Sequence, residues 1–511
     1  MRINRVRALV AGCAPLLVFL ASFAGVARAD DFVPLPAVTG PIPVTSESRP
    51  FRDRIGPPLV ALAKAGYIEA EFFVSGAANV YTWDGNNTPI VRTADAPYTT
   101  RIIVRRPAKA SRFSGTVWVE PLNPTLGVDL DRMWQLQYAQ LLRDGDAYVG
   151  ITIKPIALAA LQIFDPIRYA SLSMANPLPP ALQTCGLLPG EPGYTANLSK
   201  LYENGLAWDI ISQVGALLKS SGPDNPLGTP AARVFGTGWS QTGGYAIRYF
   251  STFGANARSS SGERVYDGWL TGGATAPAPI EQCSSIPSAT DPRNQIRPSG
   301  VPVISLRTQG DFFSFAYRRA DSDAVDDRYR LYELAGPSHD TTTIFENFAP
   351  DADIIAAGVV PPNPAVCNYE HINDFPYEYY FNAATVNLKL WTEGVAPPYA
   401  GRYEYGAGAP FPPILLDEFG NAKGGVRSPY LDVPIATYNA GAAFAPGVPF
   451  TCLVLGYKAP FDDDLLRELY PQHGDYVKRV IAVTNALVKQ RLLLRVDAGA
   501  INSDAASVDV P

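Results

Sequence analysis

The middle of the chain alternates between short apolar runs, rich in β-branched and aromatic residues, and stretches whose apolar residues recur every three or four positions. The first pattern is typical of buried strands and the second of amphipathic helices. Buried strands are predicted at residues 115–120, 148–153, 233–236, 265–270, 301–306 and 328–334, and helices at residues 130–141 and 206–217. This alternation favours an α/β fold with a mostly parallel sheet, flanked by helices and connected by right-handed crossovers.

Two further segments are expected to add to this core on its N-terminal side and within it. Residues 67–83 and 98–106 are rich in β-formers between turn residues, which predicts a pair of strands or a hairpin. Residues 154–200 separate a predicted strand from a predicted helix by a long excursion, which we interpret as a lid-like insertion. We therefore expect a single core over residues 30–395 with a β-rich N-terminal addition.

The C-terminal third is less regular than the core. Residues 396–413 are rich in proline, glycine and tyrosine, which is typical of a loop or linker. A late amphipathic helix is predicted at residues 477–488. We expect residues 396–511 to form an extension that packs on the core.

The first 29 residues have the pattern of a secretory signal peptide. Arg2, Arg5 and Arg7 precede an apolar stretch, and Ala27-Arg28-Ala29 follows it as an A-x-A cleavage site. The pattern predicts a signal peptide at residues 1–29 and a mature chain that is secreted or periplasmic after cleavage near Ala29.

The N-terminus also has two other interpretations. Val10-Ala11-Gly12-Cys13 resembles a bacterial lipoprotein cleavage box, but the chain stays apolar well past Cys13, so lipidation is the less favoured interpretation. A membrane anchor would require that the A-x-A site escapes cleavage. No other apolar run approaches the roughly 18 residues of a membrane span, so we expect no integral membrane segment in the mature chain.

Charge and cysteine content narrow the class of function. The net charge of −6 argues against a nucleic-acid partner, which would require a basic face.

The cysteines predict disulfides. Cys185, Cys283, Cys367 and Cys452 remain after signal cleavage, which predicts two disulfides whose pairing stays open. No two of them lie close in sequence and no C-x-x-C occurs, so a zinc site is the weaker alternative. With no dinucleotide fingerprint either, no cofactor and no metal are expected.

A glycine-rich turn lies between the predicted strand at residues 233–236 and a helix that runs to about residue 250. The turn has the sequence Gly238-Trp-Ser-Gln-Thr-Gly-Gly244. A serine at such a bend is exposed above the sheet edge, and the next backbone N–H points to the same space. Ser240 is therefore a candidate nucleophile. The alternative is a simple turn former, since Thr242 stands where G-x-S-x-G has its second glycine.

A serine nucleophile needs a neighbouring base, and the chain contains only three histidines. His339 follows the predicted strand at residues 328–334, at a strand's carboxyl end, where α/β sheets gather their catalytic groups. His371 lies in a polar loop, and His473 lies near the late helix. We predict that His339 is the general base and that the other two are surface or packing residues.

An acid should lie between the serine and the histidine in chain order. Asp311 follows the predicted strand at residues 301–306 and is the candidate that would orient the imidazole of His339. The alternative is that Asp311 is a simple loop acid. Its rivals lie in a crowded acidic segment that is more typical of a solvated face, and they are Asp321, Asp323, Asp326 and Asp327.

An oxyanion hole needs two hydrogen-bond donors. The backbone N–H of Gln241 is one candidate, because it follows the nucleophile directly. The second donor should come from the loop after the predicted strand at residues 115–120. Prolines there lack an N–H, which leaves Asn123, through its side chain or backbone, or Leu122.

Several blocks spread over nearly the whole mature chain resemble secreted and bacterial proteins known only as α/β-hydrolase domain proteins. They are Gly66-Tyr-Ile-Glu-Ala-Glu-Phe-Phe-Val-Ser75, Arg101-Ile-Ile-Val-Arg-Arg-Pro107, Val117-Trp-Val-Glu-Pro-Leu-Asn-Pro124, Trp239-Ser-Gln-Thr-Gly243, Tyr329-Arg-Leu-Tyr-Glu-Leu-Ala-Gly336 with His339, and Gly420-Asn-Ala-Lys-Gly-Gly-Val-Arg427. The resemblance implies an α/β-hydrolase fold in which Ser240 and His339 are nucleophile and base. In that family the bend looks like G-x-S-Q-[ST]-G, which Thr242 fits. The family often has a glutamate close to where Gln309 stands, so Asp311 would have to serve as the acid here.

These observations predict a serine hydrolase that most readily cleaves a small-molecule or lipid-like carboxylic ester. The 26 tyrosines and 23 phenylalanines are enough to line an apolar pocket, although they could equally fill the core. The alternatives are a peptidase, lactonase or acyltransferase that uses the same triad, and a non-catalytic binding protein that retains the fold.

Overall fold

The computed structural model describes residues 32–52, 60–179, 202–274, 276–282, 290–311, 318–408, 413–441 and 447–510. The predicted signal peptide and its Cys13 alternative lie outside these ranges, as do Cys185, Cys283 and most of the second half of the predicted insertion. Within the described ranges, no helix has the length and apolar character needed to cross a membrane.

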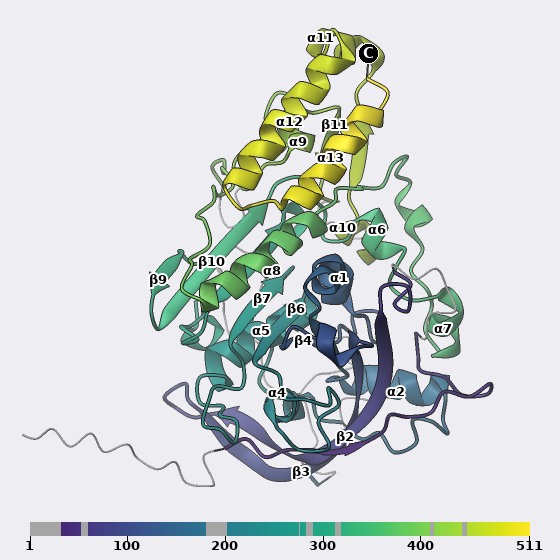
Figure 1. Cartoon of the computed structure of the whole chain (residues 1–511), viewed down its shortest axis with the longest axis vertical. Coiled ribbons are helices and arrows are strands. Elements are labelled where there is room, and N and C mark those ends of the chain that lie inside the picture. Colours follow the sequence, from purple (N-terminus) through teal and green to yellow (C-terminus); the bar gives the residue numbers. More distant parts are fainter. Residues whose placement is uncertain are drawn as a thin grey trace, which may run out of the picture.

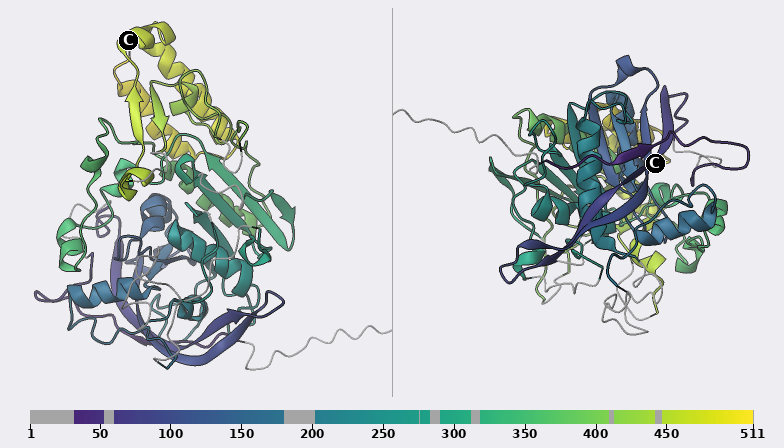
Figure 2. Two further views of the ribbon diagram at one scale, coloured as in Figure 1. Left: turned by 180° about the vertical axis from the view of Figure 1, so that it is seen from behind. Right: turned by 90° about the horizontal axis from the view of Figure 1, so that it is seen from below.

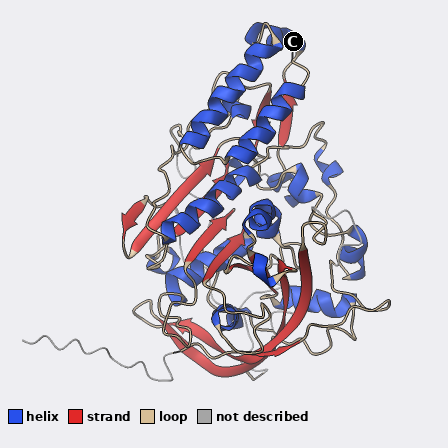
Figure 3. Ribbon diagram, viewed as in Figure 1, coloured by secondary structure: helices blue, strands red, loops and turns tan. Residues whose placement is uncertain are grey.

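A ten-stranded sheet forms the centre of the described structure (Figures 1 and 3). In sheet order its strands are β1 (Ala37–Thr39), β2 (Tyr67–Trp83), β3 (Pro89–Pro107), β5 (Ala147–Ile151), β4 (Thr116–Pro121), β6 (Arg233–Trp239), β7 (Gly268–Gly272), β8 (Val303–Thr308), β10 (Asp327–Leu334) and β9 (Ser322–Ala324). The strands from β5 to β10 pair in parallel, while β1, β2, β3 and β9 pair antiparallel with their neighbours. The expectation of a mostly parallel sheet flanked by helices is therefore confirmed.

Helices cover both faces of the parallel part of the sheet (Figure 1). Helices α1 (Arg132–Asp144) and α8 (Glu378–Thr392) pack together on one face, where Gln137 of α1 donates a hydrogen bond to Thr385 of α8 over 2.9 Å. Helices α4 (Ala207–Lys219) and α5 (Gln241–Arg248) cover the other face. Strands buried on both faces in this way lose the alternation of polar and apolar residues, which is why they are continuous apolar runs in the sequence.

The predicted N-terminal hairpin is present as β2 and β3, which pair antiparallel along almost their whole length. Together they curve around one end of the molecule, in purple at the bottom of Figure 1 and in the foreground of the view from below in Figure 2. The inner end of β3 pairs antiparallel with β5, so the hairpin continues the central sheet rather than forming a separate layer.

Most of the C-terminal elements lie at the opposite end of the molecule from this hairpin, while α10 lies nearer its middle, beside α6 (Thr342–Phe345) (Figures 1 and 2). The C-terminal elements are α9 (Pro429–Asp432), β11 (Ala436–Asn439), α10 (Phe450–Val454), β12 (Tyr457–Pro460), α11 (Asp463–Leu469), α12 (His473–Lys489) and α13 (Arg495–Ser507). Asp497 of α13 accepts hydrogen bonds from Arg143 of α1 and Asn382 of α8, over 2.9 and 3.0 Å. These contacts join the C-terminal elements to the helices on one face of the sheet.

Several helices lie where the sequence analysis predicts none. They are α2 (Pro155–Phe164), which begins the predicted insertion, α6 (Thr342–Phe345), α7 (Asp351–Ala356), α8 and α13. Helix α2 is apolar and half of α8 is buried, so neither has the one-sided polar stripe that marks an amphipathic helix. Helix α13 has almost no amphipathic pattern and is held by its contacts with α12.

Candidate active site

Ser240 lies alone between the last residue of β6 and the first residue of α5. Its φ and ψ angles are 55° and −121°, a conformation that a residue with a side chain rarely adopts. The Ser240 N–H donates to the carbonyl of Gly272 over 2.9 Å, and its carbonyl accepts from the Gly244 N–H over 3.1 Å. The strand before and the helix after therefore impose the strained bend, which is the expected environment of an exposed nucleophile.

The residues around Ser240 explain how so sharp a bend is accommodated. A Cβ atom at position 238 would lie 2.5 Å from the carbonyl oxygen of Thr242, so this position requires glycine. Thr242, which departs from G-x-S-x-G, is completely buried, and its hydroxyl donates to the carbonyl of Trp239 over 3.1 Å. The threonine thus stabilises the bend with a hydrogen bond that a glycine could not make.

His339 and Asp311 come from the carboxyl ends of two neighbouring parallel strands, β10 and β8. The last residues of these strands, Leu334 and Thr308, are register partners, so the loops that follow start side by side. In these loops Nδ1 of His339 is hydrogen-bonded to Oδ1 of Asp311. The second carboxylate oxygen of Asp311 accepts from the Thr308 N–H over 2.7 Å, which holds the carboxylate in place.

The close approach of these two loops depends on Gly310. A Cβ atom at this position would lie 2.5 Å from the backbone nitrogen of His339. Gln309 makes a further connection, because its side-chain oxygen accepts from the Gly336 N–H over 3.0 Å. Gln309 therefore joins the loops, and Asp311 is the carboxylate that contacts the imidazole.

The rival acids lie elsewhere in the described structure. Asp321, Asp323 and Asp327 form ion pairs with Arg402, Arg330 and Arg319, respectively. Asp323 and Asp327 lie at the first residues of β10, and Asp321 accepts a hydrogen bond from the Leu331 N–H in the middle of that strand, whereas His339 lies beyond its carboxyl end. The structure therefore brings Asp311, and none of the rival aspartates, to His339.

The other two histidines lie away from this site. The side chain of His371 is about half exposed and lies 3.9 Å from a carboxylate oxygen of the neighbouring Glu370. His473 is the first residue of α12, and its Nδ1 is 3.2 Å from the carbonyl of Val510. Both positions agree with the expectation of surface or packing residues.

Ser240 and His339 both line one cavity of about 570 Å³. Among the described residues no hydrogen bond joins the Ser240 hydroxyl to His339, although both side chains reach the same space. The hydrogen bond between a serine hydroxyl and its neighbouring base is often long in the absence of a substrate. The rest of the wall comes from the loops after β4, β5 and β7, from α5 and from α10, and includes Thr125, Lys154, Tyr245, Pro277, Ala278, Phe450 and Val454.

The two candidate oxyanion donors have different environments. Gln241 lines the cavity and begins α5, where a backbone N–H has no partner within its own helix. Asn123 is completely buried and is not part of the described cavity wall. Its N–H donates to Leu130 and its side-chain amide donates to the carbonyl of Trp239, both over 2.8 Å. The structure thus directs Asn123 away from the cavity, as a link between the loop after β4 and the bend at Ser240.

The charge state of His339 follows from its surroundings. Burial lowers the pKa of His339, but the neighbouring Asp311 carboxylate, through its charge and its hydrogen bond, more than offsets this effect. Asp340 raises the pKa further, while Arg132, which is ion-paired with Asp340, lowers it. The net result is a pKa of His339 above its usual value of 6.5.

The aromatic side chain of Trp239, which precedes Ser240, packs against the imidazole of His339. The ring of Trp239 is fully buried, and its centroid lies 5.1 Å from that of His339. Tyr377 stacks on the same indole with a centroid distance of 5.7 Å, and its hydroxyl donates to the His339 carbonyl over 3.2 Å. His339 is therefore held between Asp311 on one side and a packed aromatic group on another.

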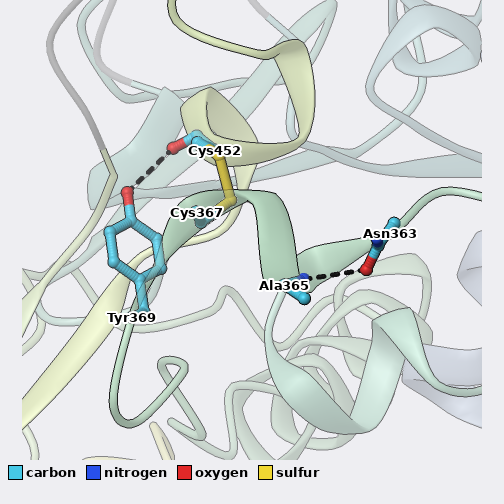
Figure 4. The surroundings of a disulfide bond; sticks show 5 residues. All are labelled: Asn363, Ala365, Cys367, Tyr369 and Cys452. Atoms are coloured by element: carbon cyan, nitrogen blue, oxygen red, sulfur yellow. Dashed lines mark hydrogen bonds between the residues drawn. A yellow bond between two sulfur atoms is a disulfide. The ribbon is translucent and has the colours of Figure 1, made fainter.

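A disulfide supports the wall that α10 contributes to the cavity. Figure 4 shows the bond between Cys367 and Cys452, where the hydroxyl of Tyr369 donates to the carbonyl of Cys452 over 3.2 Å. Cys452 lies in α10, the helix that contains Phe450 and Val454 of the cavity wall. This bond confirms one of the two expected disulfides. The second disulfide stays a prediction, because Cys185 and Cys283 lie outside the described ranges.

Sequence reasoning missed the contributions of Lys154, Tyr245, Phe450 and Val454 to the cavity. The contribution of Tyr245 could have been predicted, since it lies in α5, the short helix that directly follows Ser240. Lys154 follows β5 at the carboxyl edge of the sheet, which is a positional signal of the kind used for His339. Nothing in the local sequence points to Phe450 and Val454, which come from more than one hundred residues after His339.

Known proteins that resemble the chain were also compared. A family model described as "Alpha/beta hydrolase domain" matches residues 38–503. An S-formylglutathione hydrolase from Agrobacterium tumefaciens is 11% identical, with a TM-score of 0.29 and coverage of 59% of this chain and 97% of that one. A glucuronoyl esterase from Solibacter usitatus is 11% identical, with a TM-score of 0.27 and coverage of 57% and 82%. No curated protein sequence matches. The two structures are too distant to indicate what this chain acts on.

Proposed function

Because this chain belongs to the alpha/beta hydrolase domain family, we propose that it is a serine hydrolase that cleaves carboxylic esters through an acyl-enzyme on Ser240. The observation that carries the proposal is the hydrogen bond between His339 and the buried Asp311, at the edge of a cavity that Ser240 also lines. A nucleophile on a strained bend, a base and an acid that orients the base are the three parts that this chemistry needs.

The proposed reaction has two halves. The hydroxyl oxygen of Ser240 attacks the ester carbonyl while Nε2 of His339 accepts the hydroxyl proton. The imidazolium, stabilised by Asp311, gives this proton to the departing alcohol, which leaves an acyl group on Ser240. Water then attacks the acyl carbonyl and gives a proton to His339. The imidazolium returns this proton to the Ser240 oxygen as the bond to the acyl group breaks, so that the acid leaves and both residues are restored. The Gln241 N–H is the proposed donor to the oxyanion in both halves.

The cavity favours a small-molecule or lipid-like ester. Its volume of about 570 Å³ is within the usual range for small-molecule sites. Apolar residues such as Pro277, Phe450 and Val454 form much of its wall. Since Phe450 and Val454 belong to the predicted extension at residues 396–511, we propose that this extension packs on the core at residues 30–395 and completes the substrate pocket.

The proposed location is outside the cytoplasm. Its support is the basic and apolar pattern of residues 1–29, together with the disulfide between Cys367 and Cys452. Disulfides persist mainly in oxidising compartments, such as the periplasm and the extracellular space.

Covalent labelling tests the proposed nucleophile. We expect a fluorophosphonate probe to modify the folded protein on Ser240, since an activated serine is required for this reaction. Mass spectrometry of the digested protein identifies the modified residue, and heat-denatured protein is the control that should remain unlabelled. A folded protein with no adduct on Ser240 would favour the non-catalytic binding alternative.

The same preparation distinguishes esterase from peptidase. We expect hydrolysis of p-nitrophenyl esters and no cleavage of a peptide panel. Peptide cleavage without ester hydrolysis would contradict the esterase proposal while leaving the triad in place.

The pH dependence of the reaction should report the titration of His339. Only the neutral imidazole can accept the serine proton, so kcat/KM should rise with pH and reach half its plateau above pH 6.5, because Asp311 raises the pKa of His339. The measurement is a pH profile of p-nitrophenyl ester hydrolysis. His371→Ala and His473→Ala serve as controls and should not shift it. A midpoint below 6.5 would contradict the prediction.

A further inference from the structure

Lys154 contributes a positive charge to the same cavity. It directly precedes α2, in the loop that follows β5, and it lines the cavity together with Ser240. Its Nζ lies over the ring of Tyr245, 5.3 Å from the ring centroid. Strand β4 alone separates β5 from β6, so the ends of these two strands are about 10 Å apart.

Lys154 differs from two other partly buried lysines, Lys219 and Lys389, in having no carboxylate partner among the described residues. Lys219 pairs with Asp267 at 3.0 Å, and Lys389 pairs with Asp146 at 3.0 Å. Within the described ranges, no aspartate or glutamate forms an ion pair with Lys154. Its charge is therefore available to a ligand in the cavity.

The acidic residue of the same wall does not neutralise this charge. Glu281 lines the cavity, but it forms an ion pair with Arg92 and accepts a hydrogen bond from the hydroxyl of Thr82 over 2.8 Å. Arg92 in turn pairs with Glu203 at 3.1 Å. Glu281 thus belongs to a separate network, and Lys154 is the charged group that faces the cavity without a counter-ion among these residues.

Burial also affects the protonation of Lys154. It lowers the pKa of Lys154 to about 8, so the ammonium is still the main form at neutral pH. A desolvated ammonium without a partner is unfavourable, and the face of the Tyr245 ring offsets this cost only in part. A carboxylate that enters the cavity would supply the missing counter-ion.

We propose that the ester cleaved at Ser240 carries a carboxylate on its acyl part, and that this carboxylate pairs with Lys154 while the ester carbonyl lies against Ser240. The inference rests on the proposed esterase function and names its substrate class. The acyl chain of a short dicarboxylic acid has a length similar to the roughly 10 Å between the ends of β5 and β6, which are followed by the loop with Lys154 and by the bend at Ser240.

A matched pair of substrates tests the inference. The monoanionic p-nitrophenyl hydrogen adipate and the neutral p-nitrophenyl heptanoate have acyl chains of similar length, and the uncatalysed rate is subtracted for each. In the unmodified protein we expect kcat/KM to favour the adipate ester about tenfold to hundredfold, the range expected for a hydrogen bond to a charged group. In Lys154→Met the ratio should fall to about one through loss of the adipate rate alone. Lys154→Arg should retain part of the preference.

The control variant is Lys489→Met, which removes an exposed lysine at the end of α12 and should leave both rates unchanged. Equal losses on the two esters in Lys154→Met, or a preference that survives this substitution, would overturn the inference.

A binding measurement separates failure of the inference from failure of the proposed function. Calorimetric titration with adipamic acid and with neutral hexanamide needs no turnover. We expect the anion to bind at least about tenfold more tightly, and Lys154→Met to abolish the difference. Charge-selective binding without ester hydrolysis would support the anion site and contradict the esterase proposal. Ester hydrolysis with neither charge-selective binding nor charge-selective rates would leave the esterase proposal intact and overturn the role of Lys154.

Discussion

Replacing Ser240 with alanine is expected to lower kcat for ester hydrolysis by about a million-fold, with little change in fold or stability. The substitution removes the oxygen that forms the acyl-enzyme, and loss of a nucleophile from a triad has an effect of this order. Alanine keeps the Cβ atom that the strained bend already accommodates, and the backbone hydrogen bonds to Gly272 and Gly244 do not involve the serine side chain. The measurement is p-nitrophenyl ester hydrolysis, together with thermal unfolding monitored by circular dichroism.

The control for this substitution is Ser322→Ala, in the edge strand β9. It should retain the full rate. A Ser240→Ala protein that is folded and keeps more than about one hundredth of the activity would show that another group is the nucleophile, because the residual catalysis of triads without their serine is far smaller.

Replacing Asp311 with asparagine is expected to lower kcat by about ten-thousand-fold. In the proposed mechanism the carboxylate, which is hydrogen-bonded to Nδ1 of His339, stabilises the imidazolium, whereas an amide can donate to Nδ1 and hold the imidazole in the wrong tautomer. The side chains have nearly the same shape, so the hydrogen bond from the Thr308 N–H can persist and the loop should keep its conformation. Steady-state kinetics with a p-nitrophenyl ester provide the measurement.

Asp321→Asn is the matched control for the acid. Asp321 pairs with Arg402 and accepts from the N–H of Leu331, in the middle of β10, over 2.9 Å, whereas His339 lies beyond the carboxyl end of that strand. This variant should retain activity within a factor of a few. Full loss of activity in Asp321→Asn with little loss in Asp311→Asn would assign the acid to the rival position and contradict the geometry described above.

The fold class and the position of Ser240 could be predicted because both depend on local patterns. The alternation of strands and helices appears in the periodicity of apolar residues, and the bend requires small residues within a few positions of the serine. Thr242 was the one local departure, and its buried hydroxyl explains it through a hydrogen bond to Trp239. His339 could also be predicted as the base from the sequence, since the chain has only three histidines and only one of them follows a predicted core strand.

The role of Asn123 could not be predicted from the sequence. Its position after β4 suggested an oxyanion donor, but its N–H and side-chain amide donate hydrogen bonds to the carbonyls of Leu130 and Trp239 instead. Which way a side chain at a strand end points depends on the neighbouring strand's loop, and the sequence of one loop does not contain that information. The pairing of Asp311 with His339 likewise depends on the parallel register of β8 and β10.

The sequence by itself determined the α/β architecture, the bend that carries Ser240 and the candidate base, because each follows from residues close together in the chain. Only the tertiary structure decided which aspartate meets His339, that Lys154 reaches the cavity without a carboxylate partner among the described residues, and that Phe450 and Val454 complete its wall. The physical reason is that burial, strand register and charge pairing in this cavity arise between segments that lie far apart in sequence, so their relation exists only after packing.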